Sequence, residues 1–357
     1  MNSPQNLLKL AESYLKESVT PQANTIDSDN KALQNALFGL GKLGLLALKV
    51  HSSNSREDFQ AFQELVARHS GALAFVQTQH QSASAMLAQS ENDLLKQEYL
   101  PQLGNGNVLL GIGFSHLRRE GEPIVKAVEV KGGFQIEGFV PWVTGFGLFQ
   151  QFIVAASLPD GQTVFGIVPF VQTQGATGAI AFSQPIKLAA MSSTNTVTAT
   201  LENWLLPSDS VVSIQPKGWI QENDKKNILN ATGLILGCAM AGLDIVQAAY
   251  SDKKLSAIAQ AYKVLNQELS NCRTAIGVEQ NHFTTFNTRL QLRAWAIDLA
   301  LRCTHAAVIV SSGAANYTNH PAQRVYREAL VFTVSGQTTA VMEASLALVA
   351  TTSLICW

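Results

Sequence analysis

The seven histidines of this 357-residue chain are scattered and show no metal-binding spacing. Neither HxxxH nor HExxH occurs, and the aspartates and glutamates follow no pattern typical of a metal site. The chain also lacks a GxGxxG after a strand and a GxxxxGK[ST] motif, which argues against a Rossmann or P-loop nucleotide site. The sequence therefore predicts no metal, and any cofactor must be bound by another architecture.

The four cysteines, Cys238, Cys272, Cys303 and Cys356, lie far apart and form no CxxC pair. Such spacing indicates reduced thiols, and with no signal peptide recognisable at residues 1–10 it predicts a cytoplasmic protein. The net charge of −1 gives no reason to expect nucleic acid or a membrane as a partner. Only 14% of the residues are charged, which favours buried subunit interfaces, and so a homodimer or homotetramer.

The segment PWVTG, residues 141–145, combines a large aromatic, a hydroxyl and a glycine on an apolar strand. Taken alone, Trp142 is typical of a core aromatic and Thr144 of a hydroxyl on a strand surface. The alternating runs AVEV and FQIEG precede this segment and flank Lys131-Gly132-Gly133. That pattern predicts a β-hairpin, because glycine accepts a positive φ without steric cost.

Helical patterns surround this β region. Residues 1–107 place apolar residues at steps of three and four and predict four or five helices, with Ser55 and Ser90 as two of the N-caps. Residues 108–216 carry short strands between turns, typical of a small antiparallel barrel or sandwich. Residues 217–357 predict about four long helices, and thus a four-helix bundle. The sequence predicts an α+β chain of three domains with these boundaries.

Four segments in this order resemble the acyl-CoA dehydrogenase family over nearly the whole chain. They are SENDLLKQEYLPQLGNGNVLLGIGFS, KGGFQIEGFVPWVTG, MSSTNTVTATLENWLLPSDSVV and HPAQRVYREAL. The resemblance implies an N-terminal helical domain, a middle β-domain, a C-terminal bundle and a dimer or tetramer. It also implies FAD held between the β-domain and the bundle.

The resemblance assigns five cofactor-binding positions. Trp142 and Thr144 match the family's tryptophan and threonine that stack on the flavin ring and hydrogen-bond its edge, and Ser115 matches the threonine of its "TEP" motif. Lys254 stands where the family has an FAD-contacting arginine, and the bidentate fork is lost. Gly313 is the glycine that remains of the run "Q..GG.G" beside the pyrophosphate.

The loop HLRREGEP, residues 116–123, is shorter than the family's loop and carries Arg118 and Arg119. Two interpretations stay open for these arginines. They form a solvated loop, or they contact a phosphate or carboxylate of the substrate.

The catalytic base of the family has no counterpart here. α,β-Dehydrogenation needs a carboxylate that takes the α-proton while hydride leaves for the flavin. Ser335 stands where the family has the glutamate of "YEGT", and Asn227 stands at the alternative glutamate position early in the bundle. Glu343 is expected on the bundle surface. The chain resembles a divergent member that lacks the usual glutamate, and its catalytic residue stays unassigned.

Three functions remain open. The first is an acyl-CoA dehydrogenase-like flavoprotein that oxidises the CH–CH bond of an acyl-CoA or similar small molecule and passes electrons to an acceptor protein. The second is a flavin-dependent monooxygenase-type enzyme, whose reaction needs no α-proton base. The third is a flavin-free binding or structural homologue. The overall resemblance favours the first.

Overall fold

The computed structural model describes residues 4–50, 55–282 and 285–352. Six α-helices precede the sheet in the described part of the chain, one more than expected, because the six-residue α2 is separate. They are α1 (Pro4–Tyr14), α2 (Ala23–Ser28), α3 (Asn30–Lys42), α4 (Arg56–His69), α5 (Gly71–Ala88) and α6 (Asp93–Leu103).

The predicted N-caps of this region have different outcomes. Ser55 accepts from the backbone of Asp58 and forms a full capping box at the start of α4, as predicted. Ser90 was expected to cap α6, but Asn92 caps that helix. The Ser90 hydroxyl instead donates to the carbonyl of Val212 at 2.5 Å, so it joins the helical region to the sheet.

The middle region is one open, mixed sheet with strand order β6-β7-β8-β3-β2-β4-β5-β9, in which β1 pairs with β4. Six of the eight strand pairings are antiparallel, while β1–β4 and β2–β4 are parallel. The sheet does not close, so the sandwich form of the prediction is the one confirmed. Its strands are β1 (Leu110–Gly113), β2 (Val125–Val130), β3 (Gly133–Val143), β4 (Gln151–Ser157), β5 (Thr163–Pro169), β6 (Thr173–Gly175), β7 (Gly178–Phe182), β8 (Val197–Pro207) and β9 (Val211–Gln215).

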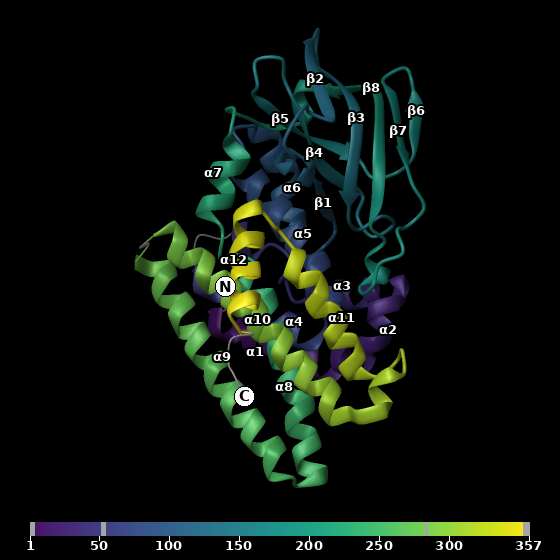
Figure 1. Ribbon diagram of the computed structural model, residues 1–357. Helices are drawn as coiled ribbons and strands as arrows, with labels where there is room; N and C mark the ends of the chain where they lie inside the picture. The colour runs from purple at the N-terminus through teal and green to yellow at the C-terminus, as the bar shows by residue number, and fades with distance from the viewer. Residues whose placement is uncertain (1–3, 51–54, 283–284, 353–357) are drawn as a thin grey trace.

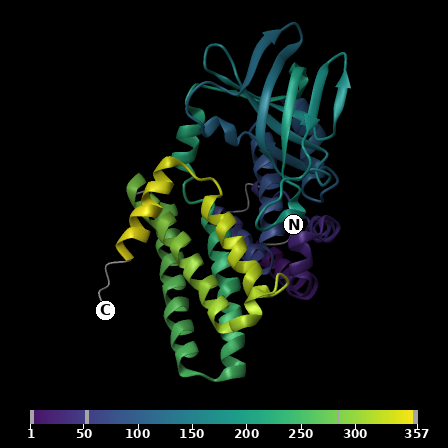
Figure 2. The same cartoon turned by 45° about the vertical axis from the view of Figure 1, so that its right-hand side comes forward.

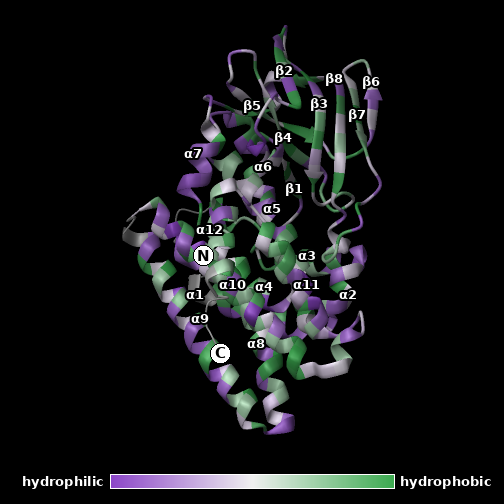
Figure 3. Cartoon of the chain, in the orientation of Figure 1, coloured by the Kyte–Doolittle hydropathy of each residue, from purple (hydrophilic) through white to green (hydrophobic). Residues whose placement is uncertain are grey.

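The chain leaves the sheet through a short helix and enters the bundle. The helices are α7 (Trp219–Lys226), α8 (Thr232–Lys253), α9 (Ser256–His282), α10 (Phe286–Ser311), α11 (Pro321–Val334) and α12 (Thr339–Thr352). Figure 3 shows α7 as largely hydrophilic, consistent with its role as a surface connection between sheet and bundle. The predicted bundle of long helices is confirmed.

The sheet lies at one end of the molecule and the bundle at the other, with the N-terminal helices between and behind them (Figures 1 and 2). One continuous apolar core joins all three regions, since it includes residues such as Leu73, Phe152 and Leu236. Helix α8 and the segment Phe286–Asn316 are long and apolar enough to cross a membrane, but a core helix passes the same test. Two thirds of the apolar window of α8 is buried inside the protein.

The predicted domain limits fall near these changes of structure. Helix α6 ends at Leu103 and β1 begins at Leu110, while β9 ends at Gln215 and α7 begins at Trp219. The boundaries at 107 and 216 stay predictions about independent folding units.

Candidate functional site

Trp142 is turned out of the sheet by a β-bulge. Val140 pairs with Ala199 and Val143 pairs with Val197, so β3 has one more residue than β8 in this interval. Along β3 exposed and buried side chains alternate up to the exposed Phe139. The extra residue of the bulge shifts this alternation by one position, so that Trp142 is exposed. The indole is 47% exposed, so its face is free to stack on a flat ligand.

Thr144 lies just beyond Trp142 in a small cluster of hydroxyls. Its Oγ1 is 3.0 Å from Oγ1 of Thr196, which is 3.3 Å from Oγ1 of Thr194. The next amide, that of Gly145, donates to the Thr194 carbonyl at 2.9 Å. Thr144 is therefore buried with its hydroxyl already bonded, and not on a bare strand surface.

Ser115 reaches the same edge of the sheet from β1. A Cβ on Gly113 would stand 3.1 Å from the side chain of Val143, and one on Gly111 would stand 3.3 Å from the carbonyl of Thr144. Because both residues are glycines without a Cβ, the end of β1 can lie this close to the end of β3. The Ser115 hydroxyl is buried and has no hydrogen-bond partner. An unpaired buried hydroxyl is costly, which makes Ser115 a candidate partner for a polar atom of a ligand.

His116 fixes the altered loop to the sheet. It is buried, and its Nε2–H donates to the carbonyl of Ala155 on β4 at 3.1 Å. Burial lowers the pKa of His116 to about 4, so the ring is neutral near pH 7. The described contacts give His116 an anchoring role.

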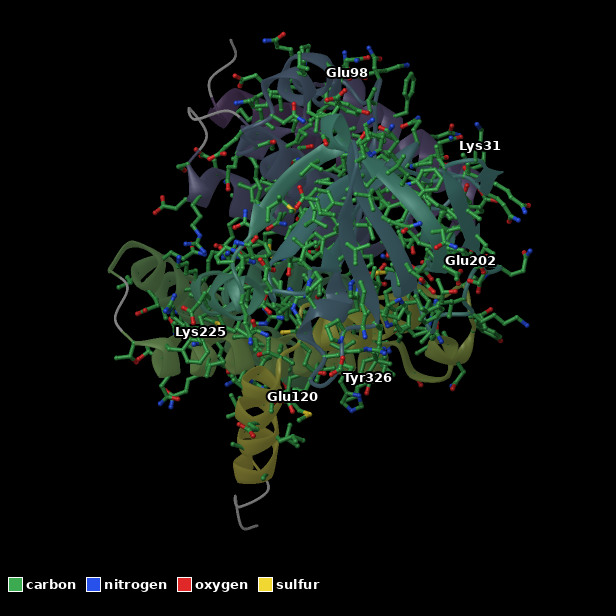
Figure 4. The ribbon with its side chains drawn as sticks, turned by 90° about the horizontal axis from the view of Figure 1, so that it is seen from above. Lys31, Glu98, Glu120, Glu202, Lys225 and Tyr326 are labelled. Carbon is green, nitrogen blue, oxygen red and sulfur yellow. The ribbon has the colours of Figure 1, made fainter. Side chains whose placement is uncertain are left out.

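Arg118 holds the loop onto α7. Its Nε and one terminal nitrogen contact the two carboxylate oxygens of Asp224 at 2.7 and 2.8 Å. Arg119 is exposed. Seen from above in Figure 4, Glu120 and Lys225, neighbours in sequence of Arg119 and Asp224, lie toward the same side of the molecule. A substrate anion would have to share Arg118 with Asp224, whereas Arg119 faces solvent.

Asn227 and Ser335, the residues predicted to stand at the family's two base positions, lie near one buried arginine. Asn227 ends α7, and its side chain donates to the carbonyl of Asn223 at 3.0 Å. Ser335 ends α11, and its hydroxyl donates to the carbonyl of Val331 at 2.9 Å. Arg293 on α10 donates to the backbone carbonyls of Ile228, at 2.9 Å, and of Ser335, at 2.6 Å. The Arg293 guanidinium therefore links the backbone of Ile228, next to Asn227, to the backbone of Ser335.

Sequence reasoning did not single out Arg293. The only signal was an arginine among the apolar residues of QLRAWAIDLAL, where the one other charge is Asp298, and a charge at such a position is usually solvated. Here it is 2% exposed. Glu343 lies on the exposed surface of α12, as expected. Neither Asn227 nor Ser335 is a carboxylate, and the guanidinium of Arg293 links the backbone beside Asn227 to that of Ser335.

The α8–α9 turn, which contains Lys254, lies at the end of the bundle away from the sheet (Figure 1). Lys254 ends α8 with a φ of +53°, and the neighbouring Lys253 ammonium donates to the carbonyl of Val310 at 2.6 Å. This bond brings the α8–α9 turn beside the segment Ser312–Asn316 that contains Gly313. Since α8 has 22 residues, its ends are about 33 Å apart. The five predicted cofactor residues thus form two separate groups.

Metal and disulfide chemistry is not indicated. Within the described residues, no cluster of three or more His, Cys, Asp or Glu side chains could hold a metal ion. Cys238, Cys272 and Cys303 are free and buried, and burial raises their pKa values. Cys356 lies outside the described residues.

Comparison with known proteins adds one decisive observation. No protein-family model and no curated protein matches the sequence. A solved structure of glutaryl-CoA dehydrogenase from Mycobacterium smegmatis in complex with FADH2 superposes with a TM-score of 0.81, covering 100% of this chain and 96% of that chain at 11% identity. The chain has the acyl-CoA dehydrogenase fold. Butyryl-CoA dehydrogenase from Megasphaera elsdenii matches with a TM-score of 0.75 at 16% identity, and 98% of each chain is covered.

One edge of the sheet offers two groups that a flat cofactor ring could use. Trp142 offers an exposed aromatic face, and Ser115 offers a buried hydroxyl without a partner at the same sheet edge. These residues fit the ring of FAD, which needs stacking and hydrogen bonds at its edge. Lys254 and Gly313, predicted to hold the rest of FAD, lie instead at the α8–α9 turn and beside it, in the bundle.

Proposed function

We propose that the chain is an FAD-dependent oxidoreductase of the acyl-CoA dehydrogenase type that acts on an acyl thioester or a similar small molecule. The pairing of exposed Trp142 with the orphaned Ser115 hydroxyl at one sheet edge carries this proposal. Bound FAD supplies hydride acceptance, which no amino-acid side chain provides. Trp142 supplies the stacking face, and Ser115 and Thr144 position the ring edge.

We further propose that a second copy of the chain completes the cofactor site. The α8–α9 turn with Lys254, and the segment Ser312–Asn316 beside it, lie at the end of the bundle away from the sheet that carries Trp142 (Figure 1). A single FAD held at Trp142 therefore meets these residues only if they come from another copy. A homodimer or homotetramer in the cytoplasm, passing electrons to an acceptor protein, is consistent with that arrangement.

The colour of the purified protein tests the proposal first. A yellow protein, or one that takes up added FAD with about one equivalent per chain, supports a flavoprotein. A colourless protein that binds no FAD overturns it and leaves a flavin-free binding or structural role. Anaerobic addition of butyryl-CoA to the flavin form then tests the substrate class, since oxidation of the thioester bleaches the flavin.

A second candidate is a monooxygenase-type reaction of the same fold. The observation that favours it is the absence of a carboxylate at Ser335 and Asn227, together with the cation Arg293 between them. Such a reaction needs no base to take an α-proton. Bound flavin that butyryl-CoA fails to bleach, but that consumes oxygen when reduced chemically in the presence of substrate, favours this candidate over a dehydrogenase.

A further inference from the structure

Arg293 carries a charge that its surroundings do not neutralise. It is 2% exposed, and no carboxylate of the described residues lies within salt-bridge distance of its guanidinium. Two of its nitrogens donate to the carbonyls of Ile228 and Ser335, and its Nε is buried without a partner. Of its five N–H groups, two are therefore accounted for.

The charged groups that act on Arg293 are Arg118 and Asp224. The carboxylate of Asp224 already accepts from Nε and from one terminal nitrogen of Arg118, at 2.7 and 2.8 Å. These three residues therefore hold two positive charges and one negative charge. Burial, and next the positive charge of Arg118, lower the pKa of Arg293 to about 10, so the guanidinium stays protonated at neutral pH.

Hydrogen bonding alone does not require this charge. A neutral glutamine can donate to two carbonyls, whereas a buried cation without a counter-ion is strongly unfavourable. An uncompensated charge beside a candidate site is typical of functional positions, where the missing counter-charge comes with a ligand. Ser335 and Asn227 are only half-buried, so a ligand can approach the junction where Arg293 exerts its field.

We propose that Arg293 is a positioning and specificity-determining residue, which makes the junction of Asn227 and Ser335 selective for a ligand bearing a carboxylate. Where the family places a proton-accepting carboxylate in the protein, this chain places a fixed cation, and the substrate brings the carboxylate. The substrate-binding role of the junction rests on the proposed function. The preference for an anion stands without FAD, because it depends on the charge of Arg293 alone.

The test uses the full-length protein and two probes of equal size, butyrate and its uncharged amide butyramide. We expect wild type to bind butyrate at least tenfold more tightly than butyramide in calorimetric or NMR titrations at constant ionic strength. Arg293→Gln should bring the ratio of the two affinities close to one. Arg302→Gln is the matched control, since Arg302 lies on the same helix and already pairs with Glu268 and Asp298, so the ratio should not change.

Wild type that binds neither probe, or binds both equally, overturns the proposal, as does R293Q with an unchanged ratio. R293K covers the case in which R293Q fails to fold. A buried lysine loses its proton far more readily than arginine, so the R293K preference for butyrate should vanish between pH 7 and 9, below the Arg293 pKa of about 10, while wild type keeps it. Identical pH profiles for the two proteins would also overturn it. The protein's failure to take up FAD affects none of these ratios.

Discussion

Arg118 and Asp224 form a two-point salt bridge between the loop after β1 and helix α7. The loop differs from that of the family, and α7 leads directly to Asn227 and Ile228. Through Arg293, the same path continues to Ser335. The loop after β1 and the two predicted base positions, Asn227 and Ser335, therefore belong to one connected set of contacts.

Asp224→Asn should lower the free energy of unfolding by about 1–2 kcal/mol, because it leaves the half-buried Arg118 without its charged partner. Urea denaturation at pH 7 measures this loss. The control is Glu222→Gln on the same helix, whose pair with Lys225 is exposed to solvent and should contribute far less. Equal effects of both substitutions would contradict a structural role for the Arg118–Asp224 bridge.

Trp142→Ala should weaken FAD binding about tenfold, since loss of an aromatic stacking partner costs on the order of 1 kcal/mol or more. Stability should change little, because the indole is half exposed. Fluorescence titration with FAD is the measurement. Phe139→Ala is the control, as Phe139 is similarly exposed on β3 but precedes the bulge. If both variants bind FAD like wild type, Trp142 does not face the ring.

Gly133→Ala should destabilise the protein far more than Gly132→Ala. Both glycines have positive φ, +89° at Gly132 and +156° at Gly133, but a Cβ at Gly133 would stand 2.0 Å from the carbonyl oxygen of Leu206. Nothing lies within 4 Å of a Cβ at Gly132. We expect about 1 kcal/mol for Gly132→Ala and about 3 kcal/mol or more for Gly133→Ala in thermal unfolding. A larger loss of stability for Gly132→Ala than for Gly133→Ala would mean that the register of the β2–β3 hairpin differs from the one described.

His80→Gln should flatten the acid dependence of stability. Nδ1 of His80 accepts from the Leu110 amide at 2.9 Å, and Nε2–H donates to the Leu103 carbonyl at 3.1 Å. Burial lowers the pKa of His80 from its ordinary value of 6.5 to about 4. Between pH 6.5 and 4 the unfolded chain takes up a proton that the folded chain refuses, so stability falls as the pH falls.

That fall amounts to about 3 kcal/mol from His80, from the difference between its two pKa values. Glutamine can accept and donate at the same two places but does not titrate. Chemical denaturation of both proteins at pH 7, 5.5 and 4 measures the difference in slope. Curves that stay parallel down to pH 4 would show that His80 is not the source.

The fold was predictable where local chemistry and tertiary packing agree. Gly132-Gly133 predicted the β2–β3 hairpin because only glycine accepts those φ values, and Ser55 predicted the start of α4 through its capping box. The prediction that Ser90 caps α6 was wrong, because its hydroxyl donates to a buried acceptor, the Val212 carbonyl, on a strand far away in the sequence. Local patterns contain no information about such distant partners.

The residue types of Trp142, Ser115, Asn227 and Ser335 were set by the sequence alone, and with them the absence of a carboxylate at either base position. Only the tertiary structure decided that a bulge exposes Trp142, that Asp224 pairs with Arg118, and that Lys254 and Gly313 lie apart from the other predicted cofactor residues. It also brought Arg293 to the junction of the base positions. The physical reason is that hydrogen bonds and charge pairs between residues 40 to more than 100 positions apart depend on packing, which no local periodicity encodes.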